Sequence, residues 1–142
     1  MEAIRPFQAN NGHHVVGVIT INGVHMPIPI PGKPVRGSKT GIPIMALFDL
    51  LGRTWALGVL WQLQEGPHTF RALQKRCDSI SPSILNSRIK DLREANIAER
   101  TLEGYQLTER GNKLIRLIKP FGDWSRAWAT EVFDYSPKDI PE

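Results

Sequence analysis

The strongest constraint on the fold is a capped turn between two amphipathic segments. Apolar residues recur at helical spacing over 70–77, and Ser81 and Pro82 follow shortly after. Serine is a favoured helix N-cap, and proline suits the first helical position because its missing N–H would have no partner there. We therefore predict a second helix over about 82–95, followed by Asn96 in a left-handed conformation. Two helices joined in this way form a helix-turn-helix.

The segments on either side of this turn complete a larger pattern. Helical spacing of apolar residues predicts two helices before it. After it, we predict two short strands and one long helix, capped by Thr108 and kinked by Pro120. This order is that of a winged helix-turn-helix, so the predicted class is mainly α with a small β-hairpin (α+β). The expected ranges are 43–52 and 53–65 for the first helices, 97–101 and 105–107 for the strands, and about 109–133 for the last helix.

The first 42 residues have a different character. Asn22-Gly23, flanked by β-branched residues, is a strong signal for a two-residue turn, and we predict an N-terminal β-hairpin over 14–30. The prolines of its returning strand cannot donate ladder hydrogen bonds, so that strand would lie at an edge. Residues 31–42 form a basic linker rich in proline and glycine. The predicted division is an extension over 1–42, a winged-helix domain over 43–134 and a tail over 135–142.

The charge of the chain leans weakly toward a polyanionic partner. Its 18 Lys and Arg against 14 Asp and Glu give a formal net charge of +4 and a pI of about 9.5. Residues 1–42 hold four basic residues and one acid, a net charge of +3, and are the most basic part per residue. Because many basic proteins bind no polyanion, charge alone does not assign the partner.

Other features narrow the class of protein. The single cysteine, Cys77, excludes an intrachain disulfide and fits a reducing compartment. The chain shows neither a secretory leader pattern nor a run of about 18 apolar residues, so we predict a cytoplasmic protein without a membrane span. It lacks a phosphate-binding loop, a nucleophile motif and a metal-ligand set, which predicts no enzyme and no cofactor. His13, His14 and His25 could meet across the hairpin, but no acidic or cysteine ligand accompanies them, so no metal site is predicted.

The helix over 82–95 is suited to reading DNA. In a helix-turn-helix, the second helix enters the major groove with its N-terminal residues near the base edges. At 100° per residue, the apolar residues at 85, 89 and 92 share one face, and Ser83, Ser87 and Lys90 point the opposite way with Asn86 on the flank. Asparagine can pair bidentately with adenine, and serine is permissive. A solvated helix face explains the same residues, so the face alone leaves both interpretations open.

Four segments together resemble a known family. They are Leu51-Gly52-Arg53-Thr54-Trp55, the run from Gly66 to Leu73, the run from Ile80 to Leu92, and the run from Tyr105 to Gly111. In this order, over about 43–128, they are similar to the HxlR-type branch of winged-helix regulators, near the MarR group. The resemblance implies a homodimeric transcription regulator that binds double-stranded DNA at a pseudo-palindromic operator.

The resemblance also implies which residues lie near DNA. Carried over by position, they are Ser81, Ser83, Asn86, Ser87, Arg88 and Lys90. Arg88 lies off the outward face, so a salt bridge to a neighbouring acid is the alternative for it. The short wing is acidic, which leaves Arg100 at its base as the expected wing contact. Redox-sensing members of the family carry a cysteine before or within the first helix, and this chain has none there.

The last helix carries a wide apolar stripe that is a candidate dimer interface, because aromatic residues are enriched at interfaces. The alternative is that the helix folds back and closes its own core. The candidate interface residues are Leu114, Leu117, Ile118, Phe121, Trp124 and Trp128.

Two further features each have a functional and an ordinary interpretation. Cys77 follows Lys75-Arg76, and basic neighbours favour a thiolate, so it could sense oxidants; most lone cysteines are instead small buried hydrophobes. Lys33, Arg36 and Lys39 could follow the minor groove as a DNA-binding arm, or could belong to a solvated linker.

Two other functions stay open. The modest charge of 43–134 is compatible with a protein-interaction module that docks through its N-terminal hairpin. A small-molecule sensor is the third hypothesis, with Trp55, Phe121 and Trp124 as pocket walls.

Overall fold

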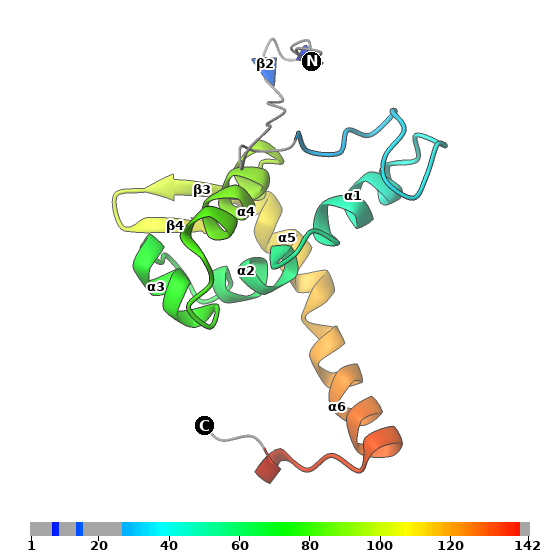
Figure 1. The fold of residues 1–142 in the computed structure, drawn as a ribbon, viewed down its shortest axis with the longest axis vertical. Coiled ribbons are helices and arrows are strands. Elements are labelled where there is room, and N and C mark those ends of the chain that lie inside the picture. Colours follow the sequence, from blue (N-terminus) through cyan, green and yellow to red (C-terminus); the bar gives the residue numbers. More distant parts are fainter. Residues whose placement is uncertain (1–6, 9–13, 16–26, 140–142) are drawn as a thin grey trace.

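The computed structural model describes residues 7–8, 14–15 and 27–139. A helical domain with a two-stranded wing occupies the centre, and one helix projects from it (Figure 1). The described elements run in the order β1 (Phe7–Gln8), β2 (His14–Val15), α1 (Pro43–Leu51), α2 (Ala56–Leu63), α3 (Phe70–Arg76), α4 (Pro82–Glu94), β3 (Ala98–Thr101), β4 (Gly104–Leu107), α5 (Glu109–Ile118), α6 (Pro120–Phe133) and a short 3-10 helix (Pro137–Asp139). The predicted fold class, a mainly α winged helix-turn-helix, is confirmed.

The helix-turn-helix consists of α3 and α4. The Ser81 hydroxyl accepts a hydrogen bond from the Ile84 N–H at 3.3 Å, as expected of an N-cap. In the turn, Asp78 and Ser79 adopt φ of 53° and 55°, which short polar residues tolerate. Asn96, with φ of 59°, follows α4 in the predicted left-handed conformation. The local signals that predicted this motif are therefore confirmed.

The wing is an antiparallel pair in which Ala98 lies opposite Leu107 and Thr101 opposite Gly104. His68 adds a single bridge to it through two backbone hydrogen bonds with Tyr105. The next residue, Thr69, caps α3, and the helix begins at Phe70.

The core lies between the helix-turn-helix, the wing and α5. Val59, Leu60, Leu73, Leu85 and Leu92 are fully buried at its centre. At the first turn of α5, a Cβ on Gly111 would lie 2.0 Å from the Ile97 carbonyl oxygen, so only glycine allows this approach. The Thr108 hydroxyl caps α5 by accepting from the Gly111 N–H at 3.0 Å. This junction fixes the wing against α5.

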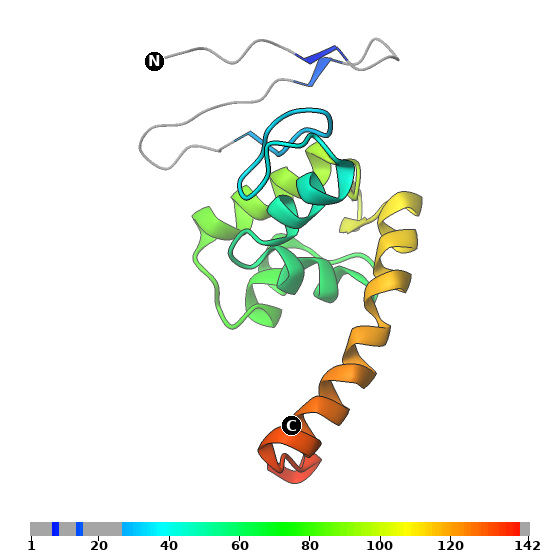
Figure 2. The ribbon, with the colours of Figure 1, turned by 90° about the vertical axis from the view of Figure 1, so that its right-hand side faces the viewer.

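The long C-terminal helix divides at Pro120 into α5 and α6. Proline at the first position of α6 is compatible with a kink because it donates no backbone hydrogen bond. The helix does not fold back: α6 projects away from the domain in both ribbon views and buries none of its residues (Figure 2).

The segment before α1 differs from the prediction. Residues 27–30 form no strand, so the returning strand predicted there is wrong for them, and most of the hairpin around Asn22-Gly23 lies outside the described residues. The 31–42 segment forms a hydrogen-bonded loop, closed by Gly32 N–H to Gly41 O at 2.9 Å and by reciprocal bonds between Val35 and Ser38. The division at residue 42 stays a prediction.

Within the described part of the chain, no single helix is long and apolar enough to cross a membrane. Together α1 and α2 pass that test by composition, but they are bent by 88°. Their apolar content also has a structural explanation, because Leu50, Val59 and Leu63 belong to the buried core.

Candidate DNA-binding interface

Helix α4 presents a row of small polar side chains on the face opposite the core. Leu85, Ile89 and Leu92 are buried, whereas Ser83 and Asn86 are exposed. Ser87 and Lys90 are half-buried on the same outward side. We call Ser83, Asn86, Ser87 and Lys90 the reading face. Among the described residues, their side chains make no hydrogen bond or ion pair, which leaves their donors and acceptors free for a ligand.

Two of the residues predicted to contact DNA also have structural roles in α4. The hydroxyl of Ser81 is used in the helix cap. Arg88 pairs with Asp91 at 3.2 Å and points to the flank of the helix, which agrees with the salt-bridge alternative. Burial lowers the pKa of the Arg88 guanidinium; Asp91 opposes this shift, and Arg53 adds to it. Arginine nevertheless stays charged at neutral pH.

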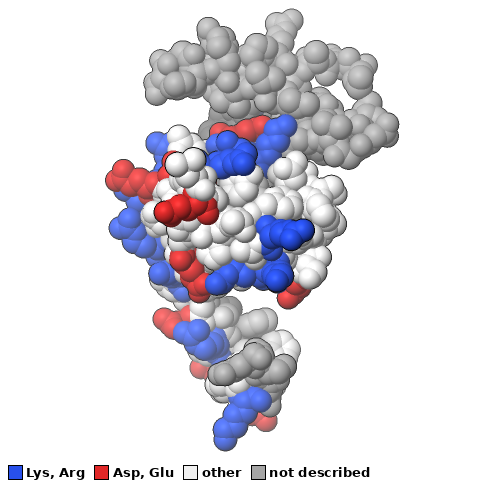
Figure 3. All heavy atoms as spheres, turned by 90° about the vertical axis from the view of Figure 1, so that its left-hand side faces the viewer, with Lys and Arg blue, Asp and Glu red and all other residues white. Residues whose placement is uncertain are grey.

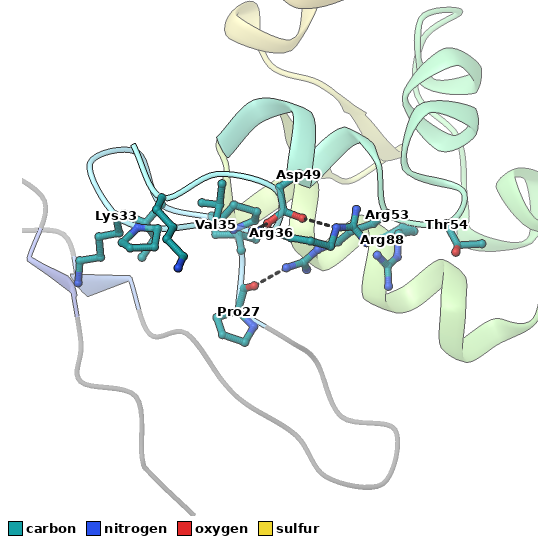
Figure 4. Close-up of a pocket in the computed structure, with 13 residues that line it drawn as sticks. Pro27, Lys33, Val35, Arg36, Asp49, Arg53, Thr54 and Arg88 are labelled. Atoms are coloured by element: carbon teal, nitrogen blue, oxygen red, sulfur yellow. Dashed lines mark hydrogen bonds and ion pairs between the residues drawn. The ribbon is translucent and has the colours of Figure 1, made fainter. Parts of the chain in front are cut away.

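A buried ion-pair cluster ties α4 to the α1–α2 connection. Arg53 Nη1 lies 2.8 Å from Asp91 Oδ1, and the two side chains are only 14% and 1% exposed. The same guanidinium donates to the carbonyl of Pro27 (Figure 4). Arg53 therefore joins α4 to the segment that precedes α1.

Beside this cluster lies an open hollow of about 770 Å³, which we call the basic hollow. Arg36 pairs with Asp49 of α1 through its guanidinium at 3.2 Å and its backbone N–H at 3.1 Å (Figure 4). Among the described lining residues, five cationic side chains face one carboxylate, and this excess of positive charge favours anions. The charged lining residues are Lys33, Arg36, Lys39, Asp49, Arg53 and Arg88.

The wing offers little positive charge to DNA. Arg100 is exposed at its base, with its guanidinium 5.9 Å from the centre of the Tyr105 ring, and Leu102 and Glu103 are exposed at its tip. On the face shown in Figure 3, Lys and Arg are spread over the domain with Asp and Glu among them. On this face, the cationic side chains do not form one broad basic patch.

The predicted dimer residues divide into two groups. Leu114 and Ile118 pack against the domain's own core. The others are exposed on the last turn of α5 and along α6: Leu117, Phe121 and Trp124 are 73%, 67% and 67% exposed. Trp128 stacks on Trp124 with ring centres 6.0 Å apart. We call Leu117, Phe121, Trp124, Trp128 and Val132 the α6 apolar face.

Cys77 lies in the core and is 1% exposed. Burial raises the pKa of its thiol, and Asp78 adds to the shift. The basic neighbour Arg76 binds Glu65 at 2.7 Å. This environment opposes the thiolate that an oxidant sensor would need. The described residues also contain no group of three or more potential metal ligands.

Sequence reasoning missed Arg53, Asp49 and Asp91. Asp91 lies near the outward side of α4 on a helical projection, so its burial could not be read from periodicity. The spacing of Arg88 and Asp91, three residues apart, was the one local signal of their ion pair.

The three-helix core, the capped turn before α4 and the paired wing define a winged helix-turn-helix protein. Residues 50–133 match the HxlR-like helix-turn-helix family, and the chain belongs to this family. It is therefore a DNA-binding transcription regulator, as the sequence predicted.

Curated relatives agree with this assignment. The chain is 29% identical over 85 residues to the HTH-type transcriptional regulator YodB of Bacillus subtilis, a match that covers 55% of this chain and 76% of YodB. It is 24% identical over 88 residues to an HTH-type transcriptional regulator of Methanocaldococcus jannaschii, which covers 59% of this chain and 83% of that protein.

Solved structures resemble the same region. Quinone-bound YodB superposes with a TM-score of 0.55 at 30% identity, covering 59% of this chain and 96% of YodB. A MarR-family regulator from Enterococcus faecalis gives a TM-score of 0.57 at 16% identity, covering 72% of this chain and all of that one, and shares the fold alone.

Proposed function

We propose that the protein acts in the cytoplasm as a homodimer that reads a pseudo-palindromic operator. Helix α4 of each subunit would enter the major groove, with half-sites about one helical turn, roughly 34 Å, apart. The reading face carries this proposal, because its exposed and half-buried polar side chains have no partner among the described residues and the opposite face of α4 is buried in the core. Asn86 is the strongest candidate for base recognition, since asparagine can pair bidentately with adenine.

Phosphate contacts would supply much of the affinity. Lys90 belongs to the reading face, and Arg100 lies at the base of the wing. The loop residues Lys33 and Lys39, which line the basic hollow beside α4, are further candidates for contacts with the DNA phosphates. Arg36 and Arg88 lie in the same hollow, and their ion pairs give them a positioning role.

The dimer would form through the α6 apolar face. Large apolar side chains on a helix that leaves its domain are costly in water and mark an interaction site. A second copy is the occupant that a two-fold operator requires, because the symmetry of the operator mirrors that of the protein. Leu114 and Ile118 would support this face from the core.

Fluorescence anisotropy tests the proposal. Promoter DNA from upstream of the protein's own gene is compared with a scrambled duplex across a salt series. We expect tight binding to the promoter alone, with an affinity that falls steeply as salt rises. The salt slope is the slope of the logarithm of the binding constant against the logarithm of the salt concentration. Lys90→Ala should lower its magnitude by about one, as the loss of one phosphate contact does.

Lys113→Ala is the matched control, because Lys113 is an exposed lysine of α5 that pairs with Glu109 at 3.7 Å. Its salt slope should equal that of the wild type. Equal affinity of the wild type for the promoter and for the scrambled duplex would refute specific regulation.

A further inference from the structure

An apolar pocket of about 320 Å³ lies between α1, the segment 28–31 and the junction where α4 meets the wing. Leu47 and Leu50 of α1 form one wall, and Ile97 and Leu114 form the other. Ile28 lies on the remaining side. A volume near 300 Å³ with mostly apolar walls is typical of small-molecule sites.

One of the described residues that line this apolar pocket is charged. Arg110, on the first turn of α5, is exposed, and among the described residues its side chain forms no ion pair or hydrogen bond. None of the described residues that line the pocket carries a carboxylate. The walls therefore suit an apolar body, and the free guanidinium suits a single carboxylate, which arginine binds in a bidentate geometry.

The pocket lies on the inner face of α1. Ala46 and Leu50, which line it, are only 4% and 5% exposed. Ile44 and Phe48, which do not line it, are 46% and 58% exposed on another face of the same helix. A partner protein that covers the outer face of α1 would leave this pocket in place, so a small molecule is the occupant that fits it.

The pocket is joined to the recognition helix through the segment before α1. Ile28 and Pro29 line both the apolar pocket and the basic hollow. The adjacent Pro27 carbonyl accepts a hydrogen bond from Arg53, which in turn binds Asp91 of α4. A ligand that displaces Ile28 and Pro29 would therefore disturb the contact that positions α4.

We propose that this apolar pocket binds an apolar monocarboxylate and that binding lowers the affinity for the operator. The effect on DNA rests on the proposed function, whereas the binding itself does not. Binding of an effector at one site commonly changes the affinity of a second site by about 5- to 150-fold. We expect the Kd for the operator to rise about 10-fold when the pocket is saturated with the carboxylate.

The test uses 2-naphthoate as the probe and the neutral 2-naphthamide as its matched control. Titration calorimetry and methyl NMR of the full chain should show one site per chain, with shifts at Ile28, Leu47 and Leu114. Arg110→Gln should weaken 2-naphthoate about 10-fold, because it removes a charge-assisted hydrogen bond, and should leave 2-naphthamide unchanged. Arg116→Gln, an exposed arginine of the same helix outside the pocket, should change neither.

Leu47→Phe, which narrows the pocket from a half-buried position, should weaken both compounds. The absence of saturable binding, or methyl shifts confined to α6, would overturn the pocket. Binding without a change in operator affinity would overturn the coupling. If the protein binds no operator at all, the methyl NMR titration still decides whether 2-naphthoate binds in the pocket. The failure of one proposal is therefore distinguishable from the failure of the other.

Discussion

Arg53 and Asp91 lie 38 residues apart in sequence and meet at 2.8 Å in the interior. Asp91 is the carboxylate partner of Arg88 as well, so one buried acid binds a guanidinium of α4 itself and one from the α1–α2 connection. The orientation of α4 therefore depends on a contact from the α1–α2 connection as well as on the apolar core.

Replacing Asp91 by asparagine should destabilise the protein by about 3 kcal/mol. The change leaves two partly buried guanidinium groups without their carboxylate, and breaking one side of a buried pair is strongly destabilising. Urea unfolding followed by circular dichroism measures the effect. Asp123→Asn, at an exposed ion pair on α6, should cost less than about 0.5 kcal/mol. Equal stability of the two variants would contradict a structural role for Asp91.

Gly111→Ala should destabilise the domain by about 1–3 kcal/mol, the usual cost of overpacking. The new Cβ would overlap the Ile97 carbonyl, so α5 would have to move away from the wing. Gly122→Ala is a matched control, because the nearest atoms to its Cβ are side-chain atoms 3.7 Å away. In a helix that second change should be neutral or stabilising. Thermal unfolding compares the two, and an unchanged Tm for Gly111→Ala would refute the close junction.

Cys77 should react slowly with iodoacetamide in the folded protein. Because burial raises the thiol pKa, the protonated thiol is favoured in the folded state. The protonated Cys77 thiol therefore favours the folded state below the ordinary cysteine pKa. This contribution to stability is lost as the pH rises through the raised pKa that Cys77 has in the folded protein. At pH 8 we expect labelling about 10-fold slower than in denaturant, as read by mass spectrometry. Equal rates would restore the sensor hypothesis.

Trp128→Ala should raise the dimer dissociation constant about 30-fold, the effect of losing an interface residue worth about 2 kcal/mol. Trp128 stacks on Trp124 and lies in the α6 apolar face. Sedimentation equilibrium gives the constant directly. Arg126→Ala removes an exposed residue of the same helix that pairs locally with Asp123, and should leave the dimer intact. A wild-type protein that is monomeric at micromolar concentration would contradict the α6 interface.

Local signals predicted most of the fold. Ser81, Asn96 and Thr108 mark helix boundaries through hydrogen bonds and dihedral angles that involve only neighbouring residues. The reading face could also be predicted from the sequence, because helical periodicity places Ser83 and Ser87 opposite Leu85. The prediction of a strand over 27–30 was wrong. The composition of this segment gives no sign that the Pro27 carbonyl accepts a hydrogen bond from the distant Arg53.

Long-range contacts were outside the reach of sequence patterns. The partner of Arg36 is Asp49 across the loop, and the partner of Asp91 is Arg53 on another element. Likewise, the stripe on the last helix is continuous in sequence, but only the fold separates Leu114, which faces the core, from Trp124, which faces solvent.

The central claim is that α4 reads base sequence, and a panel of operator duplexes with single base-pair changes tests it most directly. Affinities are measured for the wild type, for Asn86→Ala and for Asn112→Ala, which removes an exposed asparagine on α5. The wild type and Asn112→Ala should lose about 1–3 kcal/mol at each recognised base pair. Asn86→Ala should lose discrimination at one position of each half-site and keep it elsewhere. An identical discrimination profile for all three proteins would contradict recognition by Asn86 on this face.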